Sequence, residues 1–173
     1  MDSLIYRNED DKAYGLAGMM YTLGCVDALD TVAEVDIDSD GPMVTFSHEY
    51  YFTGSPSLYA KAAWDNLVRN FHITSLMALA NVFSRSLVRD RVSPAHEILD
   101  PVLDAIRCEG IESCPLEEDE VKKLSDNAMQ YVWRLFSNPR VHPMIQDLSR
   151  TISSRRHLSG RELLEVMEYL RIV

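Results

Sequence analysis

Three aspartates at alternate positions precede a glycine in the string Asp36-x-Asp38-x-Asp40-Gly41. This pattern opens a calcium-binding EF-hand loop, whose twelfth position supplies a bidentate glutamate. Here the twelfth position is Ser47, and the flanking residues have the pattern of strands. We therefore favour a β-hairpin in which Asp36 and Asp38 form the solvated face. Calcium binding through Asp36, Asp38 and Asp40 is kept as an alternative.

Two histidines occupy apolar faces of predicted elements. His72 belongs to the apolar stripe of a long helix, and His48 belongs to the apolar face of the second predicted strand. If they meet in the core beside Glu49, they form a ligand-binding or acid–base pocket between the hairpin and the helix. A histidine on an apolar face is more commonly a hydrogen-bonded core residue, which is the interpretation we favour.

A third combination of residues is spaced at four-residue intervals. His96, Asp100 and Asp104 share one face if their helix continues through Pro101. A histidine with two carboxylates can bind a metal or form an acid–base pair. The segment has no second histidine to complete a site. A solvated helix face is therefore the preferred interpretation.

The sequence contains no GxSxG elbow, P-loop or GxGxxG loop, so no catalytic or nucleotide-binding motif is present. Its three cysteines, Cys25, Cys108 and Cys114, include no CxxC pair. This argues against a disulfide framework or a zinc knuckle and suits a reducing compartment. We therefore expect a protein without a cofactor and lean towards one that is not an enzyme.

The N-terminal region has no basic stretch followed by an apolar one, which argues against a secretory signal. The apolar run Tyr14–Val26 is shorter than the roughly 20 residues that span a bilayer. The sequence thus predicts a cytoplasmic protein without a membrane segment.

The elements that position these residues are mostly helical. Periodicity and capping residues predict helices over about 10–29, 55–90, 93–108, 117–138, 144–153 and 159–172. Alternation predicts a hairpin with Ala33, Val35 and Ile37 facing inward. Small residues in the first helix, Gly18 among them, allow close approach of a neighbouring helix.

The helix beginning at Ser55-Pro56 is apolar on almost every side between Ile73 and Phe83, which predicts a buried central helix. We predict a mainly α fold with a minor β component. It is a multi-helix bundle around this long helix, with one small β-hairpin at about 31–52. The whole chain, 1–173, is predicted to form a single domain.

The chain carries a net charge of −10, which disfavours nucleic acid and anionic lipid as partners. The charge is uneven, with eleven acidic residues in 1–60 and six arginines in 134–161. Residues 144–170 have the outline of a helix–turn–helix. However, Glu162, Glu165 and Glu168 on its second helix would face DNA acceptors unfavourably.

These observations favour a non-catalytic, cytoplasmic protein-interaction or regulatory domain that binds a protein partner or forms a homodimer. The opposite charges of its two ends would contribute to the interface, together with the hairpin edge or the face bearing Leu164 and Tyr169. Two solvated faces are the simpler explanation of the same charges. The alternatives are a small enzyme or ligand-binding protein using His48 and His72, and the calcium-modulated domain described above.

Overall fold

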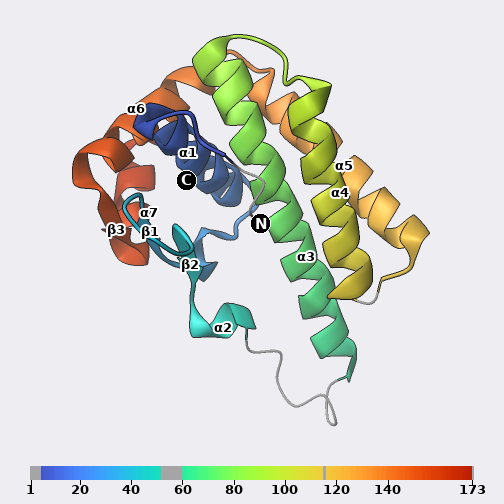
Figure 1. The fold of residues 1–173 in the computed structure, drawn as a ribbon. Helices are drawn as coiled ribbons and strands as arrows, with labels where there is room; N and C mark the ends of the chain where they lie inside the picture. Colours follow the sequence, from blue (N-terminus) through green and yellow to red (C-terminus); the bar gives the residue numbers. More distant parts are fainter. Residues whose placement is uncertain (1–4, 52–59, 115, 173) are drawn as a thin grey trace.

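The structure, a computed structural model, describes residues 5–51, 60–114 and 116–172 and is mainly helical (Figure 1). The α-helices are α1 (Glu9–Cys25), α2 (His48–Tyr51), α3 (Ala60–Phe83), α4 (His96–Glu112), α5 (Glu118–Phe136), α6 (His142–Arg155) and α7 (Gly160–Tyr169). A short 3-10 helix, η1, spans Leu29–Thr31, and a π-helix, η2, spans Ser84–Asp90. The strands are β1 (Val32–Asp36), β2 (Val44–Phe46) and β3 (His157–Ser159). The predicted class, mainly α with a minor β component, is confirmed.

The long helix α3 lies at the centre of the described structure, with α1 on one side and α4 and α5 on the other (Figure 1). Leu76, Leu79 and Phe83 are fully buried on it, which confirms the prediction of a buried central helix. The helix continues through η2 and ends at Asp90, as its apolar pattern indicated. Its predicted start at Ser55-Pro56 lies outside the described residues.

The three strands form an antiparallel sheet in the order β2-β1-β3. The first predicted strand is present, but the second ends at Phe46, and His48 begins α2 instead of continuing the strand. The rings of Phe46 and Tyr50 stack with their centroids 4.0 Å apart. Apolar residues four apart suit a helical turn as well as a strand, so alternation alone misplaced this boundary.

The alternation in β1 is interrupted by a bulge. The register with β2 shifts between Val32 and Glu34. As a result, Val32 is buried and Ala33 is exposed, so the prediction that Ala33 faces inward is wrong. Val35 and Ile37 are buried as predicted.

Helix ends follow their capping residues closely. Ser159 caps α7 in a capping box with Glu162, as the sequence indicated. Helix α4 continues through Pro101 without a break. Helix α1 ends at Cys25, earlier than predicted, because the chain turns at Asp27, whose φ is 53°. Within the described part of the chain, no helix has the length and apolar character needed to cross a bilayer.

Candidate functional site

The candidate site is built where α1 crosses the end of α3 and the start of η2. Two glycines of α1 allow the helices to touch. A Cβ on Gly18 would lie 2.3 Å from the Cβ of Ser84, and one on Gly15 would lie 2.6 Å from Nδ2 of Asn81. The small residues of the first helix therefore permit close approach, as predicted.

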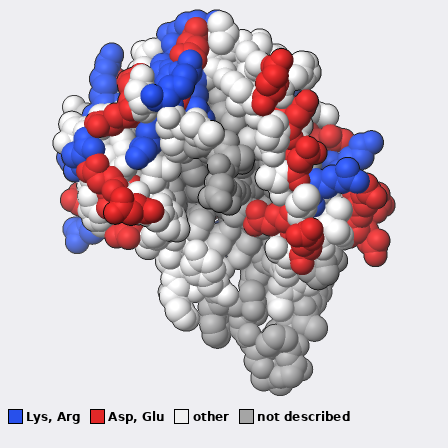
Figure 2. Space-filling model, viewed as in Figure 1, with Lys and Arg blue, Asp and Glu red and all other residues white. Residues whose placement is uncertain are grey.

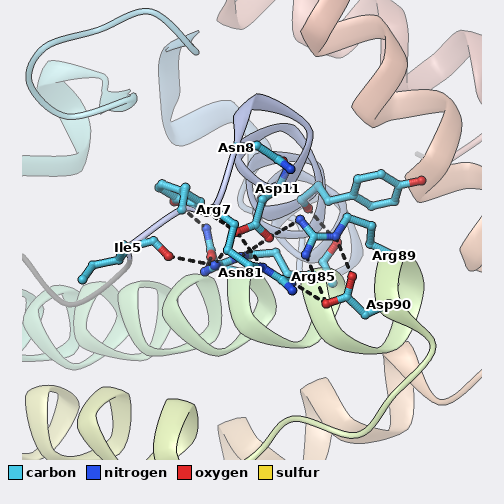
Figure 3. A network of polar contacts seen from close by, with 11 residues as sticks. Ile5, Arg7, Asn8, Asp11, Asn81, Arg85, Arg89 and Asp90 are labelled. Carbon is cyan, nitrogen blue, oxygen red and sulfur yellow. Dashed lines mark hydrogen bonds and ion pairs between the residues drawn. The ribbon is translucent and has the colours of Figure 1, made fainter.

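At this crossing, a fully buried carboxylate meets two arginines (Figure 3). Arg85 donates through Nε to Oδ1 of Asp11 at 2.7 Å and through Nη2 to Oδ2 at 2.6 Å. Arg89 forms a further ion pair with Oδ1 of Asp11. Asn8 caps α1 by accepting a hydrogen bond from the Asp11 amide at 2.8 Å. We call Asp11, Arg85 and Arg89 the buried charge cluster.

Two opposing effects act on the carboxyl group of this cluster. Burial alone would raise the pKa of Asp11, because it disfavours the charged form. Hydrogen bonds from Arg85 and from the Arg7 amide, together with the guanidinium charges, outweigh burial and leave the pKa below its ordinary value. Asp11 is therefore ionised at neutral pH.

The cluster also fixes the residues before α1. We call Ile5–Arg7 the N-terminal strap. Arg85 Nη2 donates to the carbonyl of Ile5 at 2.9 Å, and the Arg7 amide donates to Asp11 Oδ2 at 2.8 Å. The guanidinium carbon of Arg85 lies 4.8 Å from the ring centre of Tyr6, a cation–π distance. Contacts with the buried residues Asp11 and Arg85 therefore hold the N-terminal strap in one position.

Beside the cluster, the strap, η2 and the start of α4 enclose a groove with a volume of about 400 Å³. Three aliphatic side chains of the groove are largely exposed: Ile5 at 82%, Val92 at 56% and Ile98 at 47%. Charged groups of both signs accompany them, among them Arg7 and Glu97. We call this feature the strap groove. Exposed apolar side chains accompanied by polar and charged ones are the composition of a protein-binding surface.

The two histidines of the predicted pocket differ in burial, and only His72 is among the described lining residues of a cleft. His72 is half-buried on α3 and lines a different cleft, of about 600 Å³, together with Tyr131 of α5. Nδ1 of His72 is buried without a hydrogen-bond partner among the described residues, and burial lowers the pKa of its ring. His48 is exposed on α2 and is not among the described residues that line this cleft. The side chain of Glu49 lies outside the described residues.

The three aspartates of the predicted calcium loop have other partners. Asp36 accepts a hydrogen bond from the Asp38 amide at 2.9 Å. Asp38 pairs with Arg156, which donates through Nε at 2.5 Å and also through Nη2. Asp40 is exposed in the turn. A calcium ion would have to displace the guanidinium of Arg156, so the geometry does not favour that alternative.

His96, Asp100 and Asp104 lie on the exposed side of α4, in agreement with a solvated face. Among the residues that the structure describes, no group of three side chains is placed to hold a metal ion.

The distribution of charge differs from the one suggested by the sequence. Arg156 belongs to the arginine-rich segment 134–161 and pairs with Glu9 as well as Asp38 of the acidic segment 1–60. Some charges of the two segments therefore neutralise each other within the chain. Figure 2 shows that most Lys and Arg gather at the upper left, where α6 lies, with some acids among them. Asp and Glu predominate on the right, over α4 and α5. Exposed acids of that side include Glu97, Asp100, Asp104, Glu117, Glu118 and Asp119.

Sequence reasoning missed the buried charge cluster. Its signal was Arg85 and Arg89, two arginines four residues apart at the end of a helix that is otherwise apolar on most sides. Charged residues are seldom buried without a partner, so a buried acid had to exist elsewhere. Nothing local marked Asp11 among the three consecutive acids at the start of α1.

No family model and no curated protein matches this chain in sequence.

Proposed function

We propose that the chain is a non-catalytic protein-interaction domain whose strap groove binds a second copy of the chain. The observation that carries this proposal is the convergence of Ile5, Val92 and Ile98 on one groove while all three remain largely exposed. Contiguous exposed apolar surface with a polar rim is typical of interaction sites, whereas isolated exposed apolar residues are common everywhere.

The groove has the features of a site for anchoring side chains. Its volume of about 400 Å³ accommodates a few aliphatic or aromatic side chains of a partner. Buried Val82 also lines it, which gives an anchor an apolar surface to contact. Anchors that enter such pockets contribute most of the binding energy in protein interfaces. The buried charge cluster holds the strap in place, so little order has to be gained on binding.

Charge complementarity favours a second copy as the partner. The acidic side of α4 begins at the groove with Glu97. Between the groove residues Asp90 and Val92, Arg91 contacts Nδ1 of His142 at 2.7 Å, which joins the groove region to the start of α6. A twofold dimer places each patch opposite its complement on the other copy. Such a dimer weakens with salt, because exposed charges are screened.

The test measures mass by light scattering for the full chain at several concentrations in low and high salt. We expect a dimer at high micromolar concentration in low salt and a monomer for Ile98→Asp, which places a charge in the groove. Ile111→Asp is the matched control, because Ile111 is similarly exposed on the same helix, at 41%, but is not among the described groove residues. A monomeric wild-type chain would contradict the proposal, and so would equal disruption by both variants.

We also propose a cytoplasmic location. All three cysteines are free, and Cys25 and Cys108 are exposed. Free exposed thiols suit a reducing compartment. Fractionation of the source cells with an antibody to the chain tests this location, and recovery outside the cytoplasmic fraction would contradict it.

A further inference from the structure

A second cavity, of about 500 Å³, lies between the β1–β2 hairpin and the helices α1 and α3. None of its described lining residues lines the strap groove, so the two features are separate. It occupies the general position expected for a hairpin–helix pocket, but neither His48 nor His72 is among its described lining residues. Its chemistry therefore differs from the acid–base site suggested by the sequence.

Part of the wall of this cavity belongs to the core, and another part is the exposed hairpin turn Asp40, Gly41 and Pro42. Leu16 of α1, Val44 of β2 and Ala78 of α3 line it, and each is buried in the fold. A depression between mobile surface side chains would lack such walls. A pocket of this size with mainly apolar walls is typical of sites for small molecules, which range from about 300 to 1,000 Å³.

Three methionines from three different segments line the cavity. Met19 comes from α1, Met43 precedes β2, and Met77 comes from α3. Methionine is flexible and polarisable, and it adapts its shape to apolar groups better than branched side chains. Phe46 adds an aromatic face. These side chains favour an apolar ligand of variable shape over one fixed by many polar contacts.

Among the described lining residues, Asp40, Thr74 and Tyr6 carry polar side-chain groups. The Tyr6 hydroxyl has a hydrogen-bonding capacity that the described residues do not use. Tyr6 lines the cavity, and its hydroxyl accepts a hydrogen bond from Asn81 Nδ2 at 2.8 Å. Among the described residues, no acceptor is found for the proton of this hydroxyl. Burial raises the pKa of Tyr6, so the group is a neutral donor at physiological pH.

We propose that this cavity binds a small, largely apolar molecule that carries one hydrogen-bond acceptor, such as a medium-chain ketone or ester. The aliphatic part contacts the three methionines and Phe46, and the acceptor oxygen accepts a hydrogen bond from the Tyr6 hydroxyl. This binding function goes beyond the proposed protein interaction and does not depend on it.

The test is a titration of the full chain, labelled with carbon-13 at the methionine methyl groups, with 2-heptanone, followed by NMR. We expect the methyl signals of Met19, Met43 and Met77 to shift in a saturable way. Signals from Met129, Met144 and Met167 serve as internal controls, because none of them is among the described lining residues. Unchanged signals at millimolar ketone would overturn the proposal, as would equal shifts of all methyl groups.

A second experiment tests the polar contact. Tyr6→Phe removes the hydroxyl, and we expect it to weaken binding of 2-heptanone about fivefold, the effect of one neutral hydrogen bond. Binding of 1-heptene, which has no acceptor, is expected to remain within twofold. An equal change for both molecules would overturn the assignment of Tyr6 as donor.

Discussion

Of the sites where arginine meets carboxylate in this protein, the crossing of α1 and η2 and the sheet edge at Arg156 differ chiefly in burial. At the crossing of α1 and η2, Asp11 has no exposed surface and receives two hydrogen bonds from Arg85. At the sheet edge, Arg156 contacts Asp38 and Glu9 at the surface. Water screens the second site and is excluded from the first. The same residue types therefore fix the fold in one place and contribute little to its stability in the other.

The largest expected effect follows from removing the buried charge. Asp11→Asn leaves the largely buried guanidinium of Arg85 without its anion, whereas Arg89 keeps its ion pair with Asp90. We expect a loss of about 3–5 kcal/mol in the free energy of unfolding, the range for a buried pair that loses one partner. Urea denaturation at pH 7 measures it. Asp10→Asn is the matched control, because Asp10 is exposed at the adjacent position of the same helix.

The same variant has a signature in its pH dependence. The pKa of folded Asp11 lies below that of the unfolded chain, so its contribution is present above about pH 4 and is lost as pH falls through the folded pKa. In Asp11→Asn, the part of the decrease in the free energy of unfolding below about pH 4 that comes from protonation of Asp11 should be absent. If the free energy of unfolding of the variant fell with pH as steeply as that of the wild-type protein, the assignment of Asp11 as an ionised buried group would be contradicted.

The second largest effect on stability is expected where α1 approaches α3 and η2 closely and buries the charge cluster. Gly18→Ala would place a Cβ 2.7 Å from the carbonyl oxygen of Ala80, a backbone atom that cannot move alone. We expect destabilisation of about 1–3 kcal/mol from overpacking, measured by thermal or urea unfolding. Gly41→Ala is the control, because the nearest atom to its Cβ would be 3.8 Å away. Equal stability of both variants would show that α1 does not need this contact.

His72 is intermediate between the two sites, because it is half-buried and its Nδ1 has no partner among the described residues. Burial lowers its folded pKa below the ordinary value of 6.5. Wild-type stability should therefore decrease as pH falls below about 6.5, where the unfolded chain takes up the proton more readily. His72→Leu should abolish this decrease and raise stability by about 1 kcal/mol near pH 6. Parallel pH profiles of the two proteins would contradict the placement of this ring.

The smallest effect on stability is expected at the exposed site. Arg156→Gln should leave the unfolding midpoint nearly unchanged, because exposed ion pairs contribute little. Hydrogen bonds from Arg156 lower the pKa of Asp38, so the variant should shift that pKa upward towards its ordinary value. An NMR titration of the carboxyl carbons measures the shift. Arg150→Gln is the control, since Arg150 pairs with Asp147 instead.

Much of the helical framework was predictable because its signals are local. Ser159 and Glu162 cap α7 within one turn, and the apolar stripe of α3 repeats every three to four residues. The second strand was predicted too long, because Phe46 and Tyr50 fit a strand and a helical turn equally well. Strand β3 was missed, because His157–Ser159 is only three residues long and gains its hydrogen bonds from β1.

The candidate site was less predictable than the fold. Of the residues selected for their chemistry, His96, Asp100 and Asp104 share the exposed side of α4, Asp36 accepts a hydrogen bond from the Asp38 amide, and His48 does not line the cleft that His72 lines. The strap groove and the methionine-lined cavity are assembled from segments far apart in the chain, and each segment alone resembles an ordinary apolar or loop stretch.

The sequence by itself determined most of the helical segments, α2 excepted, because caps and periodicity act over a few residues. It also determined that α3 is buried, since an apolar surface on most sides leaves no other stable position. Only the tertiary structure decided that Asp11 is the acid that meets Arg85, a partner 74 residues away. That choice depends on the approach allowed by Gly15 and Gly18, which excludes water from one carboxylate and leaves its neighbours solvated. Burial of a charge is a property of the whole packing arrangement, and no local pattern contains it.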